Sequence, residues 1–187
     1  MNTKTKKLST VSMVLCGMFA ALVAIGAFIQ IPVPYMDYFT LQFFFVLLAG
    51  LILGADKGAI SVGCYVLLGL VGVPIFAAGG GIGYIFRPSF GYLVGFIVSA
   101  YVTGKVCEKL KASYKNYLLA CLAGFVVTYA IGIMYKFIIL NFYAHTPATL
   151  GVIFLSCFPL DMPGDFVLCL LAAGVGLRMR KSGFYLS

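Results

Sequence analysis

The stretch "VSMVLCGMFAALVAIGAFIQI", Val11 to Ile31, contains 21 residues and no charged side chain. An α-helix rises about 1.5 Å per residue, so a run of this length crosses the roughly 30 Å hydrocarbon core of a bilayer. A basic N-terminus precedes it, but the run is too long for the apolar core of a signal peptide, and no convincing cleavage site follows. We therefore expect a membrane-spanning helix here.

The composition of the whole chain is also that of a membrane protein. Of its 187 residues, 63% are hydrophobic and 10% are charged, and the mean hydropathy is +1.08. About a quarter of the residues of a soluble domain are charged. The chain is too short for two globular domains and has no long polar block. We expect residues 1–187 to form a single integral membrane domain.

Five further apolar segments are long enough, or nearly so, to cross a bilayer. With the first segment they predict an all-α membrane protein of six transmembrane helices. The six predicted segments are Val11–Ile31, Phe39–Ala55, Gly58–Val73, Phe90–Val106, Tyr117–Phe142 and Met162–Leu177. Several of them are short, which predicts local bilayer thinning or interrupted helices.

The basic residues predict the orientation of these helices. Eleven of the 13 Lys and Arg residues fall on one side of a six-helix zigzag: Lys4, Lys6, Lys7, Lys57, Lys105, Lys109, Lys111, Lys115, Arg178, Arg180 and Lys181. By the positive-inside rule this side is cytoplasmic, so both termini are expected inside a cell membrane. The same pattern accounts for the formal charge of +8 without a nucleic-acid partner.

The connections on the other, outer side are long, aromatic and almost free of lysine. Two basic residues, Arg87 and Lys136, and three acidic ones, Asp37, Asp161 and Asp165, fall there. Ionisable groups in or near membrane spans are costly, and such groups usually have a partner or a function. We expect Asp37 to be solvated, and the other charged residues are candidates for a binding site.

A glycine-rich stretch, "FAAGGGIGYIFRP", precedes the fourth segment and contains Arg87. Its guanidinium group can hold a carboxylate with two hydrogen bonds, or it can point at lipid headgroups. Glycine backbone permits close approach to a ligand, and nearby rings can enclose a flat heterocycle. The candidate binding residues in and near this stretch are Phe76, Gly80, Tyr84 and Tyr92.

Asp165 and Lys136 each allow a structural and a functional interpretation. Asp165 lies in the first turn of the last predicted helix, where it can complement the helix dipole or accept hydrogen bonds from ligand N–H groups. Lys136 lies toward the outer end of the fifth segment. It can snorkel to the membrane surface, or it can bind a ligand or one of the aspartates.

The sequence lacks the common motifs of enzymes and metal sites. It contains no G-x-x-x-x-G-K-[ST] phosphate loop, no nucleophilic serine elbow and no H-E-x-x-H zinc helix. Its six cysteines lack the paired spacing of a zinc site, and we expect them to be packing residues. We expect no enzymatic activity, no ATP hydrolysis by this chain, no cofactor and no metal, and we expect His145 to be a surface residue.

Several separate motifs between Ala20 and Phe96 occur in the order typical of a known family. They are Phe39-Thr40-Leu41-Gln42, Leu48-Ala49-Gly50, Gly58 with Tyr65, Gly72-Val73-Pro74-Ile75-Phe76-Ala77 and Gly91-Tyr92-Leu93-Val94-Gly95-Phe96, with a second island at "FPLDMPGDF". On these motifs the chain resembles BioY, the biotin-specific substrate-binding component (S component) of energy-coupling-factor (ECF) transporters.

The resemblance implies a six-helix bundle like that of ECF S components, which captures biotin outside the cell with high affinity. Such a protein associates with a transmembrane coupling subunit (EcfT-like) and two cytoplasmic ATPase subunits, and tips within the membrane to release biotin. The Ala-x-x-x-Ala surface that the family uses for the coupling subunit maps onto Ala20 and Ala24. Packing within the chain is the alternative role of this pair.

The resemblance also implies roles in biotin binding. In the family, an arginine near helix 4 meets the carboxylate, while an aspartate and a lysine at the start of the last helix address the ureido group. Arg87 and Asp165 match the first two, but Leu168 occupies the lysine position. Lys136 is a candidate replacement for that lysine, and Gln42 in the first motif is a further candidate substrate-binding residue.

Other functions remain open on the sequence. Because Leu168 departs from the family pattern, the ligand can be another vitamin or small heterocycle within the same architecture. A freestanding secondary transporter is an alternative from a different class, although the chain shows no convincing internal repeat. A structural scaffold would leave the outer charged residues unexplained.

Overall fold

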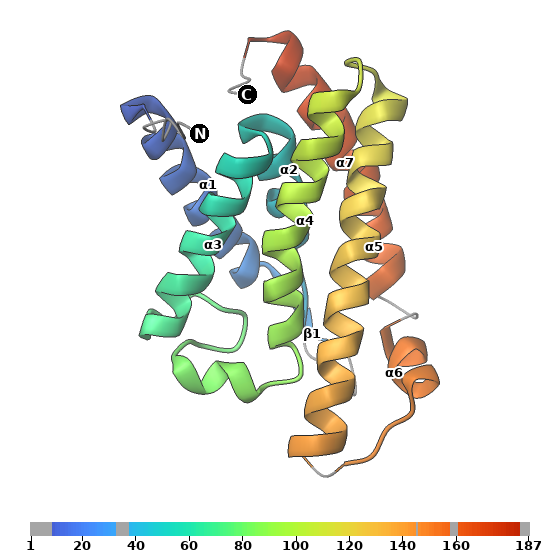
Figure 1. Ribbon diagram of the computed structural model, residues 1–187. Helices are drawn as coiled ribbons and strands as arrows, with labels where there is room; N and C mark the ends of the chain where they lie inside the picture. The colour runs from blue at the N-terminus through green and yellow to red at the C-terminus, as the bar shows by residue number, and fades with distance from the viewer. Residues whose placement is uncertain (1–8, 33–37, 145, 158–160, 184–187) are drawn as a thin grey trace, which may run out of the picture.

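The structure is a computed structural model that describes residues 9–32, 38–144, 146–157 and 161–183. Long helices form a bundle, and the described chain starts and ends at the same end of it (Figure 1). The elements are α1 (Thr10–Phe28), β1 (Gln30–Pro32), β2 (Tyr38–Thr40), α2 (Gln42–Leu53), α3 (Ala55–Val71), η1 (Ile82–Phe86), α4 (Phe90–Lys109), α5 (Tyr114–Ile138), η2 (Ile139–Tyr143), α6 (Leu150–Cys157) and α7 (Asp161–Lys181).

Each of the six predicted segments overlaps one helix of the bundle. By length and composition, four candidate membrane spans are present among the described residues: α1, α4, α5 together with η2, and α7. The other two helices, α2 and α3, are shorter, with 12 and 17 residues. The structure therefore confirms an all-helical bundle with several membrane-spanning helices.

The first connection differs from the prediction. Instead of continuing to Ile31, α1 ends at Phe28, and β1 pairs with β2 in an antiparallel hairpin that includes Phe39. Proline has no N–H group and disfavours helical backbone in the residue before it, so Pro32 cannot extend α1. The backbone N–H of Leu41 instead donates to the carbonyl of Gly26 at 3.1 Å and closes the end of the helix.

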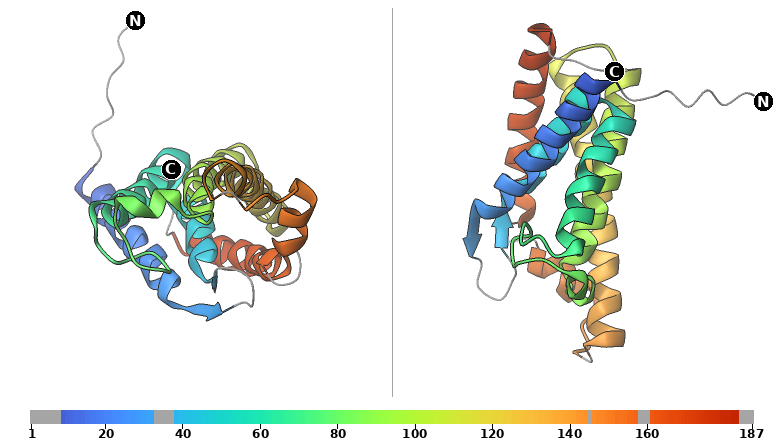
Figure 2. Two further views of the ribbon diagram at one scale, coloured as in Figure 1. Left: turned by 90° about the horizontal axis from the view of Figure 1, so that it is seen from below. Right: turned by 90° about the vertical axis from the view of Figure 1, so that its left-hand side faces the viewer.

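The connection between α5 and α7 also differs from the prediction, because it contains a helix that no sequence pattern predicted. Eight residues, Leu150–Cys157, form α6 beside α5 (Figures 1 and 2). The helix turns Ile153 and Cys157 inward, where both are buried. The end of the bundle that carries the β1–β2 hairpin, η1 and α6 is called the hairpin end below.

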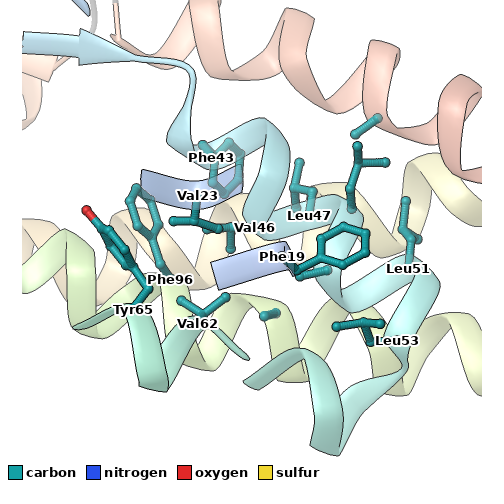
Figure 3. Packing of buried hydrophobic residues seen from close by; sticks show 14 of the residues in the cluster. Phe19, Val23, Phe43, Val46, Leu47, Leu51, Leu53, Val62, Tyr65 and Phe96 are labelled. Carbon is teal, nitrogen blue, oxygen red and sulfur yellow. The ribbon is translucent and has the colours of Figure 1, made fainter. Parts of the chain in front are cut away.

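The short helix α2 lies at the centre of the bundle. It contacts α1, α3, α4 and α7, and its residues from Val46 to Leu53 are all buried. A helix that is apolar on every side is expected in such an interior position. Figure 3 shows Val46, Leu47 and Leu51 of α2 packed among residues of the neighbouring helices.

Small residues bring the helices close together. A Cβ atom at Gly50 would lie 2.5 Å from the carbonyl oxygen of Ala100, and one at Gly95 would lie 3.0 Å from that of Thr128. Lipid cannot drive helices together by the hydrophobic effect, so close van der Waals contact of this kind stabilises the bundle.

Candidate substrate-binding cavity

A cavity opens at the hairpin end of the bundle. About 820 Å³ of empty space lies within it and at its open mouth, solvent included. Elements from the whole length of the chain form its wall. The lining residues are Phe39, Thr40, Gln42, Phe43, Ala77, Ala78, Tyr84, Ser89, Tyr92, Leu93, Phe96, Tyr129, Lys136, Asp161 and Asp165.

One part of this wall is acidic. Asp161 and Asp165 lie four residues apart in the first turns of α7 and therefore share a helix face. The hydroxyl of Tyr129 on α5 donates a hydrogen bond to Oδ2 of Asp165 at 2.8 Å. We call Asp161, Asp165 and Tyr129 the acidic pole of the cavity.

The basic residue among those that line the cavity is Lys136. It follows Tyr129 by seven residues, so it lies on the same face of α5, two turns farther along. Seven residues correspond to roughly 10 Å along a helix axis. The cavity therefore has acidic and basic side chains at two separate levels, an acidic pole beside Tyr129 and a basic pole at Lys136.

Gln42 lies on the wall at the start of α2, and two neighbours form hydrogen bonds with its side chain. Its Nε2 donates to the hydroxyl of Tyr65 at 2.5 Å, and its Oε1 accepts from the hydroxyl of Thr40 at 3.1 Å. The Tyr65 hydroxyl in turn donates to the carbonyl of Ile75 at 3.2 Å. These bonds fix the amide and tie α2 to α3 and to the glycine-rich connection.

Aromatic rings form the apolar part of the wall. Phe43 stacks on Phe96, with ring centroids 5.9 Å apart, and Tyr92 meets Tyr129 edge to face at 5.8 Å. Tyr84 covers another side and packs on Phe76 at 4.6 Å. Such rings can enclose a flat, uncharged ring system, while the two poles bind the polar groups of the same ligand.

The structure brings together five of the eight predicted substrate-binding residues: Gln42, Tyr84, Tyr92, Lys136 and Asp165 all line the cavity. Phe76 and Gly80 lie behind the wall. The ring of Phe76 is buried between Tyr84 and Tyr65, and Gly80 packs against the end of α3. These two residues support the wall.

Arg87, the eighth predicted residue, is exposed and is not among the lining residues. Its guanidinium carbon lies 5.3 Å from the centroid of the Tyr84 ring, which is cation–π geometry. Arg87 thus contacts the cavity wall through Tyr84, but it does not line the cavity that Asp165 lines. Its role toward a ligand stays a prediction.

The predicted partner-binding pair points into the bundle. Ala20 is 7% exposed and belongs to the core, and Ala24 packs against that core. The exposed small residues of α1 are instead Gly17 and Ala21, which also lie four residues apart. An added Cβ atom at Gly17 would meet no atom within 4 Å.

Sequence reasoning missed Tyr129, and it named Asp161 only among the outer charged residues, without a specific role toward a ligand. The spacing of Asp161 from Asp165 and of Tyr129 from Lys136 follows the helical period, so a search for polar residues on the same faces would have found both. Within the described ranges, no three His, Cys, Asp or Glu side chains gather as a group that could hold a metal ion.

The fold and the cavity are those of a membrane-embedded binding protein, and comparisons with known proteins identify its class. The sequence profile of the BioY family matches residues 1–183. A probable biotin transporter BioY of Lysinibacillus sphaericus is 40% identical over 94% of this chain and 90% of its own length. The biotin transporter BioY of Thermotoga maritima is 39% identical over 88% and 93%.

A solved structure agrees with these relatives. The crystal structure of the S component for biotin from an ECF-type ABC transporter matches with a TM-score of 0.83 and 25% identity, over 99% of this chain and 97% of that one. The bundle is therefore that of an ECF S component, a multi-pass membrane protein and not an enzyme. The chain belongs to the BioY family, which confirms the resemblance seen in the sequence.

Proposed function

We propose that residues 1–187 form a single domain that captures biotin outside the cell, as the S component of an ATP-driven ECF transporter. The family, the relatives and the matching crystal structure support the ligand. The observation that carries the proposal is the cavity itself, in which one wall is acidic, another is basic and aromatic rings lie between them.

The chemistry of biotin fits this arrangement. Its bicycle carries two ureido N–H donors and one carbonyl, and its flexible tail ends in a carboxylate. Asp165 accepts a hydrogen bond from a ureido N–H group, and Lys136 pairs with the carboxylate. The two levels of the wall differ by roughly 10 Å along α5, which is comparable with the length of an extended biotin molecule. Aromatic rings such as Tyr92 hold the bicycle.

This assignment gives Lys136 the role that the sequence suggested for Arg87. Lys136 lines the cavity, whereas Arg87 braces Tyr84 from outside. Leu168, at the position of the family lysine, is 5% exposed and packs in the core, so it offers nothing to the ligand. A carboxylate taken out of water needs a cation nearby, and Lys136 is placed to supply it.

The same proposal sets the orientation in the membrane. The hairpin end faces outward, the two short helices α2 and α3 also cross the bilayer, and both termini are cytoplasmic. The lysines and arginines of the predicted inner connections support this orientation. A bilayer can thin locally around short helices at modest cost.

We assign the contact with the coupling subunit to the face of α1 that contains Gly17 and Ala21. This face is open, whereas Ala20 and Ala24 are used inside the bundle. Small residues permit close helix approach within lipid. Two cytoplasmic ATPase subunits, joined through the coupling subunit, then supply the energy for transport.

Isothermal titration of the purified protein in detergent tests the ligand assignment, with thiamine and riboflavin as controls. We expect saturable binding of biotin at one site per chain and no measurable heat from either control vitamin. Binding of a control vitamin in preference to biotin would instead support an S component of another specificity.

A further inference from the structure

Asp165 does not reach the cavity as an isolated carboxylate. The 2.8 Å hydrogen bond from the Tyr129 hydroxyl occupies its Oδ2 atom. A hydrogen bond in a poorly hydrated interior is electrostatically stronger than one in water, so it restricts rotation of the carboxyl group. The remaining lone pairs of the two oxygens can still accept hydrogen bonds from a ligand, in directions that this orientation sets.

Tyr129 is itself held rigidly. It is 5% exposed, its ring lies 4.7 Å from that of Phe125, and Tyr92 meets it edge to face at 5.8 Å. Tyr92 is kept in place because its own ring packs directly over Gly132, where a side chain would collide with it. The direction of the Tyr129 hydroxyl is therefore set by α4 and α5, before any ligand arrives.

On the other side, α7 fixes the backbone of Asp165. The preceding residue, Gly164, lies under the ring of Phe39, and an added Cβ atom there would be 2.5 Å from that ring. Asp165 is thus confined between the hairpin and α5. Both restraints act on a group that the proposed function uses as a hydrogen-bond acceptor.

We propose that Tyr129 is a positioning residue that makes Asp165 a single, fixed acceptor for one of the two ureido N–H groups of the ligand. The inference rests on the proposed function. It has a consequence for specificity: the two ureido nitrogens are recognised unequally, because Asp165 is held in one orientation and faces one of them. A methyl group on the nitrogen that donates to Asp165 weakens binding more than a methyl group on the other nitrogen.

A double-mutant cycle tests the inference in the full-length protein. Biotin affinity is measured by isothermal titration for the parent, Tyr129→Phe, Asp165→Asn and the double variant, and the melting temperature of each is recorded without ligand. Tyr117→Phe is the matched control. Tyr117 is also a buried tyrosine of α5, but its hydroxyl accepts a hydrogen bond from Arg180 at the opposite end of the bundle.

We expect Tyr129→Phe to weaken biotin binding about tenfold in the parent and by less than about twofold when Asp165 is already Asn. Tyr117→Phe should leave the affinity unchanged. As a second readout, the parent should discriminate between the two biotin analogues methylated at one ureido nitrogen, and Tyr129→Phe should reduce that discrimination.

The outcomes separate the two proposals. If the parent binds no biotin, the proposed function fails, and the inference fails with it. If the parent binds biotin but the two losses are additive, or if Tyr129→Phe leaves both the affinity and the discrimination unchanged, the inference alone is overturned. If Asp165→Asn abolishes measurable binding, the cycle cannot be completed. The inference is then tested by whether Tyr129→Phe reduces the parent's discrimination between the two methylated analogues.

Discussion

Tyr65 forms two of the hydrogen bonds that hold the cavity wall in place. It is fully buried, accepts from Gln42 and donates to the carbonyl of Ile75. Tyr65→Phe would leave both groups without this partner, which costs about 1–3 kcal/mol for each buried polar group. We expect a lower melting temperature and weaker biotin binding.

The control for this variant is Tyr101→Phe, because Tyr101 is an exposed tyrosine of α4. Thermal unfolding in detergent, with and without biotin, measures both effects. Equal melting temperatures for the two variants would show that the hydrogen bonds of Tyr65 with Gln42 and Ile75 contribute little to the stability of the fold.

Among single residues, the sequence predicted charged groups better than aromatic ones. Lys136 and Asp165 could be selected because ionisable side chains are rare in apolar segments. Arg87 was selected for the same reason, yet the structure places it outside the lining. Tyr129 is one of 12 tyrosines, so its residue type did not mark it, and its seven-residue spacing from Lys136 is the local signal that could have.

Among the elements, the β1–β2 hairpin closes the cavity against α7. Gly164→Ala would press a methyl group into the ring of Phe39 and displace the hairpin. We expect biotin affinity to fall about tenfold, because Phe39 and Thr40 of β2 line the cavity. Isothermal titration measures the loss.

Gly174→Ala is the control on the same helix, since its added Cβ atom would make one ordinary contact, 3.9 Å from Tyr114. Alanine favours a helix more than glycine does, so this variant should bind biotin normally and be at least as stable as the parent. If both variants bind biotin like the parent, contact between the hairpin and α7 is not needed for the site.

The open face of α1 gives a different prediction, because Gly17 has free space around it. Gly17→Leu should fold and bind biotin like the parent, but it should lose ATP-dependent biotin uptake when reconstituted with a coupling subunit and its ATPases. The same substitution at Gly151, an exposed glycine of α6, serves as the control. Unimpaired uptake by Gly17→Leu would exclude this face as the docking surface.

The sequence predicted the long helices well, because a bilayer demands a minimum length of apolar residues. It was wrong about the ends of the first two segments, where Pro32 and strand pairing decide the boundary. It also missed α6, since an apolar run of eight residues is too short to be recognised by a length criterion.

Over the whole molecule, the cavity depends on contacts that no local pattern contains. Its lining runs from Phe39 to Asp165 and draws on the hairpin, α2, α4, α5, α7 and the glycine-rich connection. Charge placement along the sequence predicted at which end a site lies, and the family resemblance predicted its ligand. The proposal of Lys136 instead of Arg87 as the cation depends on the folded chain, in which Lys136 lines the cavity.

The most direct test of the two-pole account compares Lys136→Met with Arg87→Met, using biotin and biotinol, which lacks the carboxylate. Isothermal titration gives the ratio of the two affinities for each variant. We predict that Lys136→Met weakens biotin binding at least about tenfold and nearly abolishes the preference for biotin, while Arg87→Met keeps that preference. Loss of the preference in Arg87→Met, with Lys136→Met unchanged, would contradict the account.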